Sequence, residues 1–111
     1  MKQLKIILKG GLKSCCSTYN AEELKEFTKH WFENNEEINY DILDIEEEYW
    51  ESEPMADFAY KHLKDTIFPL VYVNDKLVAI GNFPERDECM QFVASPDPIT
   101  ENDILNAIRR A

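Results

Sequence analysis

Two adjacent cysteines, Cys15 and Cys16, are the residues of this chain best suited to chemistry. They lie between an apolar, strand-like run over residues 4–8 and a helical pattern that opens near Asn20. Thiols at a strand-to-helix turn can lie near the positive end of a helix dipole, which favours the reactive thiolate. Buried cysteines often serve only as small apolar residues. A pair within a Gly/Ser/Thr-containing loop instead favours a functional thiol site.

Capture of a soft ion and redox exchange are the two chemistries open to this pair. Two neighbouring thiolates can both bind a large soft ion, since a loop lets the sulfurs spread around it. A disulfide between neighbours holds the Cα atoms at most about 3.8 Å apart, which is below the usual range. Such a bond would be transient. One thiol, Cys16 or Cys15, could instead act alone in mixed-disulfide exchange, with Lys13 as the nearest cation in sequence.

The third thiol, Cys89, has different surroundings. It shares an apolar helical pattern with Phe92 and Val93, so a place in the core is favoured. The alternative is that Cys89 supplies a third ligand to a metal bound at Cys15 and Cys16.

Length and composition predict a single domain over residues 1–111. The chain is 44% hydrophobic, which is enough for a core. It has neither an 18-residue apolar run nor the pattern of a signal peptide, so no membrane association and a cytoplasmic location are expected. Three cysteines, two of them adjacent, do not resemble a secreted disulfide framework.

The net charge of −10 is concentrated in residues 33–53, which contain ten acids and no Lys or Arg. Direct nucleic-acid binding is not expected, because phosphate contacts need a basic face. The acids also lack the spacing and the Gly turn of a calcium loop. The segment therefore predicts a solvated acidic face, and the alternative is a docking surface for a basic protein partner.

The remaining sequence predicts an alternating α/β order that positions the cysteine loop. We expect strands over residues 3–9, 38–45, 67–73 and 76–80, and helices over about 20–34, 54–64, 85–94 and 100–110. Asn20 and Glu23 form a capping-box pattern, and Leu24, Phe27 and Trp31 a single apolar stripe.

The strand pattern adds two expectations. Apolar residues on both alternating sets of the 38–45 strand predict an interior strand with both faces covered. The two-residue link Asn74-Asp75 predicts a tight hairpin.

At this point the chain resembles the thioredoxin-like superfamily over almost its whole length. The resemblance rests on cysteine before the first helix, Pro69 at the third strand, and the Gly81-containing link after the hairpin. It implies a four-stranded mixed sheet with helices on both faces and the 3–9 strand between the 38–45 and 67–73 strands. It also implies that the Phe68–Pro69 bond is cis and that Pro69 faces the cysteine loop, where it would shape a redox site.

Within that superfamily the chain resembles the arsenical metallochaperones of the ArsD family. The similarity lies in Cys15-Cys16-Ser17-Thr18, Pro69-Leu70 and Gly81-Asn82-Phe83-Pro84-Glu85-Arg86. That family binds trivalent arsenic or antimony through cysteines and passes it to an efflux ATPase. Its third metalloid-binding cysteine corresponds to Ala21 here, and its C-terminal cysteine pairs are absent.

A second resemblance is to the YuzD-like disulfide oxidoreductases. It rests on residues 40–45 and on Phe68-Pro69-Leu70-Val71. Those proteins have a Cys-x-x-Cys loop, whereas Cys15-Cys16-Ser17-Thr18 at best imitates a single-thiol variant.

Three functions are therefore expected from the sequence, in order. The first is capture of a soft ion such as As(III) or Sb(III) by Cys15 and Cys16, with no cofactor required. The second is single-thiol disulfide exchange with a thiol-containing partner protein. The third is an interaction module without thiol chemistry.

Overall fold

The computed structural model of the protein describes residues 2–13, 17–33 and 37–110. The strands are β1 (Lys2–Leu8), β2 (Leu12–Lys13), β3 (Thr18–Tyr19), β4 (Ile38–Asp44), β5 (Leu70–Val73) and β6 (Lys76–Ile80). The helices are α1 (Ala21–Thr28), α2 (Pro54–Leu63), α3 (Arg86–Ala94) and α4 (Glu101–Arg110), with 3₁₀ turns η1 (Lys29–Phe32) and η2 (Lys64–Ile67).

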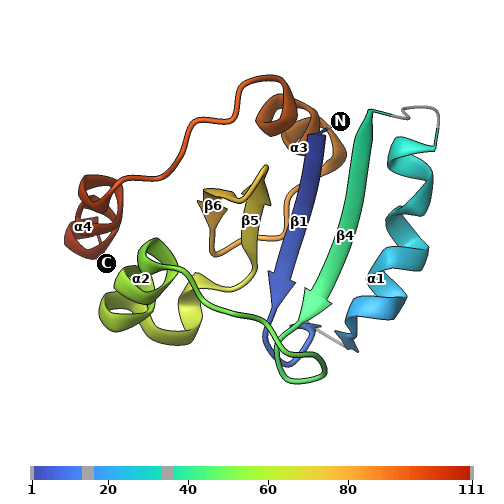
Figure 1. The fold of residues 1–111 in the computed structure, drawn as a ribbon. Coiled ribbons are helices and arrows are strands. Elements are labelled where there is room, and N and C mark those ends of the chain that lie inside the picture. The colour runs from blue at the N-terminus through green and yellow to red at the C-terminus, as the bar shows by residue number, and fades with distance from the viewer. Residues whose placement is uncertain (1, 14–16, 34–36, 111) are drawn as a thin grey trace.

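A four-stranded mixed sheet in the order β4-β1-β5-β6 forms the centre of the fold (Figure 1). β1 pairs in parallel with β4 and antiparallel with β5, which confirms the predicted place of the first strand between the other two. The β5–β6 hairpin turns at Asn74 and Asp75, whose φ angles of 51° and 67° are both positive, as the sequence predicted.

The prediction that the 38–45 strand is interior is wrong, because β4 is an edge strand of the sheet. Both of its faces are nevertheless covered. Ile42 belongs to the core on one side of the sheet and Leu43 to the core on the other. Apolar residues on both faces of a strand indicate that helices cover both faces. They do not indicate that the strand pairs with other strands along both of its edges.

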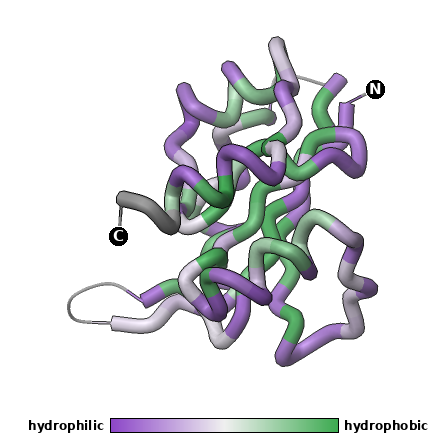
Figure 2. The backbone as a smooth tube through the Cα atoms, turned by 90° about the vertical axis from the view of Figure 1, so that its left-hand side faces the viewer, coloured by the Kyte–Doolittle hydropathy of each residue, from purple (hydrophilic) through white to green (hydrophobic). Residues whose placement is uncertain are grey.

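Two hydrophobic cores lie on opposite faces of the sheet. Leu24 of α1 and Cys89 of α3 join the first core, whereas Ala59 of α2 and Ile104 of α4 join the second. In Figure 1, α2 and α4 lie together on one side of the sheet and α1 lies on the other. The tube in Figure 2 shows hydrophobic strands at the centre and hydrophilic segments around them. This arrangement confirms the expectation of helices on both faces of the sheet.

Helix α1 begins as predicted and ends early. Asn20 accepts a hydrogen bond from the Glu23 amide and Glu23 accepts one from the Asn20 amide, which completes the capping box. The α-helix stops at Thr28 and continues as the 3₁₀ turn η1, so the helical period used for the predicted stripe does not extend to Trp31. Phe27 is 56% exposed and packs edge-on against Tyr19, so the predicted stripe is wrong at this residue.

No helix within the described residues is long and apolar enough to cross a membrane.

Candidate functional site

A hollow of about 640 Å³ lies where β1 ends, beside Pro69. One wall is formed by residues 10–13, which lead directly to the cysteine pair, and another by Phe68 and Pro69. Asn82 and Phe83 border it as well. Cys15 and Cys16 themselves lie outside the described residues, so the predicted approach of a sulfur to the proline ring stays a prediction.

The Pro69 wall joins η2 to the hairpin. The Phe68–Pro69 bond is cis, as predicted, and Pro69 is buried. The Gly81 amide donates to the carbonyl oxygens of Ile67 at 2.8 Å and Pro69 at 3.1 Å. Gly81 has a φ of 89°, a conformation that glycine adopts at little cost. The end of the hairpin is thereby tied to the segment that precedes β5.

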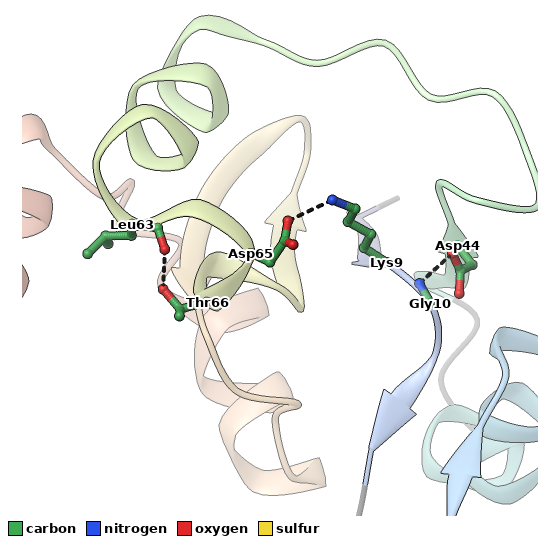
Figure 3. A network of polar contacts seen from close by, with 6 residues as sticks. All are labelled: Lys9, Gly10, Asp44, Leu63, Asp65 and Thr66. Atoms are coloured by element: carbon green, nitrogen blue, oxygen red, sulfur yellow. Dashed lines mark hydrogen bonds and ion pairs between the residues drawn. The ribbon is translucent and has the colours of Figure 1, made fainter.

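The opposite wall is held by Asp44, a carboxylate that is only 3% exposed. Its Oδ1 accepts from the Gly10 amide at 3.1 Å and from the Glu46 amide at 2.9 Å, and its Oδ2 accepts from the Gly11 amide at 2.6 Å. Figure 3 shows Asp44 at the end of β4 pointing toward the Gly10 turn. Hydrogen bonds to a charged group are about twice as strong as neutral ones. Asp44 therefore fixes the direction in which the chain leaves β1 toward the cysteines.

The sequence interpretation missed this role of Asp44. It treated Asp44 as one of ten acids in the run 33–53 and as a member of the β4 alternation. The available signal was its place at the end of a strand parallel to β1, level with Leu8 and hence next to the Gly10-Gly11 turn. Glycines with φ angles of 71° and 79° expose their amides to such an acceptor.

An ion pair joins Lys9, which follows β1, to Asp65 of η2. Lys9 Nζ lies 2.7 Å from Asp65 Oδ1 and 5.5 Å from the centre of the Tyr60 ring (Figure 3). The hydrogen bond from Lys9 lowers the pKa of Asp65 and raises that of Lys9. In the same 3₁₀ segment the Thr66 hydroxyl donates to the Leu63 carbonyl at 2.6 Å. The solvent-exposed pair contributes little to stability, and its effect is to neutralise the lysine at the edge of the hollow.

The segments on either side of the cysteine pair form a short hairpin that the sequence did not predict. β2 pairs antiparallel with β3, with Leu12 opposite Tyr19 and Lys13 opposite Thr18. Helix α1 therefore begins at Ala21, five residues after Cys16, with an extended strand in between. The helix-dipole effect is confined to the first turn of a helix. Cys15 and Cys16 lie outside the described residues, so the effect of the α1 dipole on their thiols stays a prediction.

Of the two glycines before β2, Gly11 is the more constrained. A Cβ there would lie 2.6 Å from the Tyr19 carbonyl oxygen, whereas at Gly10 it would meet the movable Glu46 carboxylate at 2.8 Å. Gly10→Ala should cost about 1 kcal/mol for the positive φ, and Gly11→Ala about 2 kcal/mol because the backbone must also shift. Urea unfolding of the two variants measures the difference. Equal losses in the free energy of unfolding would show that the close approach of Gly11 to the Tyr19 carbonyl oxygen adds no constraint on the fold.

Cys89 belongs to the core, as the sequence favoured. Its side chain is 0% exposed and lies in the core between α3 and the sheet. Burial raises the pKa of Cys89 to about 12, which keeps the thiol protonated at neutral pH. Metal binding and nucleophilic attack both use the thiolate. These properties support a packing role and not the alternative role as a third ligand.

In a Cys15→Ser/Cys16→Ser protein, Cys89 should resist iodoacetamide without denaturant and react fully in urea. Because the folded pKa of Cys89 is raised, its thiol stabilises the fold fully below about pH 9. That contribution is lost as the pH rises toward 12. The stability advantage over a Cys15→Ser/Cys16→Ser/Cys89→Ala protein should therefore shrink over this range. Rapid labelling of the native protein would contradict the assignment.

Among residues 2–13, 17–33 and 37–110, no group of three or more His, Cys, Asp or Glu side chains is arranged to hold a metal ion. The acidic run is mostly solvated: Glu46, Glu47, Glu48 and Glu51 are exposed, whereas Asp44 is buried. Compared with protein-family models and with curated proteins, the chain has no match.

Proposed function

We propose that this chain is a thioredoxin-like thiol protein that captures As(III) or Sb(III) through Cys15 and Cys16. The observation that supports the proposal most is the shared hollow, in which Lys13, two residues before Cys15, and Pro69 are both lining residues. In the sequence, the two thiols therefore follow a segment that lines the same hollow as Pro69. The parallel β1–β4 pair, the antiparallel hairpin and the cis Phe68–Pro69 bond are in keeping with the superfamily.

The start of α1 at Ala21 favours capture over exchange. A single-thiol oxidoreductase benefits from a thiolate that forms before the substrate arrives. A helix N-terminus would supply that activation, but along the sequence β3 stands between the pair and the start of α1. A chelated soft ion needs no such activation, because ligand binding itself displaces the thiol protons.

The chemistry of capture balances without a redox partner. Arsenous acid is uncharged at neutral pH, and each thiol that binds replaces one hydroxyl group and releases one water. Two thiols give a dithiolate of As(III) with one hydroxyl left and no change in oxidation state. Ala21, which corresponds to the third cysteine of the ArsD-like proteins, is 6% exposed within the core. The third position on arsenic is therefore left to hydroxide or an external thiol.

The number of arsenic atoms bound per chain tests the proposed capture. Reduced protein, freed of excess arsenite by gel filtration and measured by elemental analysis, should retain one arsenic per chain, and Cys89→Ala should retain as much. An oxidoreductase would instead form a mixed disulfide with glutathione through one cysteine, and the other cysteine would be dispensable. Loss of arsenic from a folded Cys89→Ala protein would make Cys89 a ligand.

A further inference from the structure

A second hollow, of about 320 Å³, lies next to the first between the β4–α2 connection and η2. Lys9 and Phe68 line both hollows, so the two adjoin at these residues. The lining of the second hollow is mostly apolar and comes from Ile45, Trp50, Ala56, Tyr60, Ile67 and Leu70. Ser52 and Asp57, which are hydrogen-bonded to each other, form its polar edge. We call this second hollow the acidic groove, for the charges around it.

The acidic groove is held in shape by contacts behind it. Glu53 caps α2 by accepting from the amides of Met55 at 2.9 Å and Ala56 at 2.8 Å. The same carboxylate accepts from the Tyr72 hydroxyl on β5 at 3.0 Å. The Trp50 ring packs edge-on against Tyr72, with the ring centres 6.1 Å apart. The connection that bears Trp50 is therefore anchored to both α2 and the sheet.

The β4–α2 connection beside the acidic groove carries charge of one sign, whereas Lys9 and Lys64 both lie over the Tyr60 ring that lines the groove. Residues 44–57 contain seven acids and no Lys or Arg. Glu47, Glu48 and Glu51 are exposed, whereas Asp44 and Glu53 are occupied by their backbone partners. The one lysine that lines the groove, Lys9, is paired with Asp65. An apolar floor within an acidic surround is complementary to an apolar side chain flanked by cations.

We propose that the acidic groove docks a basic partner protein through a segment in which an aromatic or aliphatic residue is flanked by Lys or Arg. The apolar residue enters beside Trp50 and Phe68, and the cations face Glu47, Glu48 and Glu51. Because the groove adjoins the hollow beside Pro69, such a partner would lie close to residues 10–13, which precede the cysteine pair in the sequence. Its role as donor or acceptor of the captured ion rests on the proposed function, whereas the docking itself requires no thiol.

Cysteine-free hexapeptides test the docking. The probes are acetyl-Gly-Lys-Phe-Arg-Lys-Gly-amide, a version with Ala for Phe, and a version with Glu for every Lys and Arg. Binding is followed by the fluorescence of Trp50 in a Trp31→Phe protein, since the chain has only these two tryptophans. The basic Phe peptide should bind, and the other two should bind at least about tenfold more weakly. Raising the salt to 1 M should weaken the basic peptide similarly, because screening then acts within about 3 Å.

Matched charge variants separate a site from general attraction. Glu47→Gln/Glu48→Gln/Glu51→Gln should weaken the basic Phe peptide at least about tenfold. Removal of three exposed acids elsewhere, in Glu22→Gln/Glu33→Gln/Glu101→Gln, should change binding less than about twofold. Equal losses in the two variants, or equal binding of the acidic peptide, would overturn the proposal.

Two further outcomes are distinguishable. Docking of a second copy of this chain in place of a basic partner would appear as self-association that the basic peptide does not reverse, and this would overturn the proposed occupant. A Cys15→Ser/Cys16→Ser protein should bind the peptide unchanged. Retained peptide binding together with absent arsenite binding would leave the docking surface standing and reject the proposed thiol function. Absent peptide binding together with retained arsenite binding would reject the docking surface and leave the proposed thiol function standing.

Discussion

Replacing Asp44 with asparagine is expected to lower the free energy of unfolding by about 3 kcal/mol. The amide has almost the same shape, but it has one acceptor oxygen where the carboxylate has two. Its NH₂ group would face either the Gly10 amide or the Gly11 amide, both of which are donors. Asp44 is 3% exposed, so its amide group in the variant could not turn toward water to avoid these donors.

Urea unfolding measures this loss, and Asp41→Asn is its control on the same strand. The Asp41 side chain is 45% exposed, and its Oδ1 lies 2.9 Å from Lys25 Nζ. Removing that exposed ion pair should cost less than about 1 kcal/mol. Similar losses for the two variants would show that the buried carboxylate does not hold the turn. The Asp44→Asn protein should also bind arsenite more weakly, since the turn leads to the cysteines.

Replacing either Cys15 or Cys16 with serine is expected to weaken arsenite binding on the order of a hundredfold or more. Two ligands on one chain act at a high effective concentration, and that advantage is lost when only one thiol remains. A hydroxyl group is also a poor ligand for a soft ion. Competition of the labelled ion against a small dithiol measures the change, and Cys89→Ala is the matched control, expected to bind as the unaltered protein does. A single serine variant with unaltered affinity would exclude chelation by the pair.

The central architecture could be predicted from the sequence because its signals are local. Asn74-Asp75 identified the hairpin, and Asn20 with Glu23 identified the start of α1. The order of these elements restricts the chain to few topologies, and the superfamily resemblance implied the place of β1 that the sheet has. The cis bond at Pro69 followed from the superfamily resemblance.

The missed features depend on contacts between distant segments. The β2–β3 strands have two residues each, too few for a period to be read. The role of Asp44 arises only when β4 lies beside β1 and brings the carboxylate to Gly10 and Gly11. The exposure of Phe27 follows from where α1 packs on the sheet, which the helical period alone does not determine.

The X-ray absorption spectrum of arsenic bound to the reduced protein tests the central claim most directly. The sample should contain one equivalent of arsenite and a phosphine reductant, so that no external thiol can contribute sulfur. Chelation by Cys15 and Cys16 predicts two sulfur neighbours and one oxygen neighbour for each arsenic, with one sulfur lost in either single serine variant. Arsenic with oxygen neighbours alone, or a spectrum unchanged in the Cys15→Ser/Cys16→Ser protein, would contradict it.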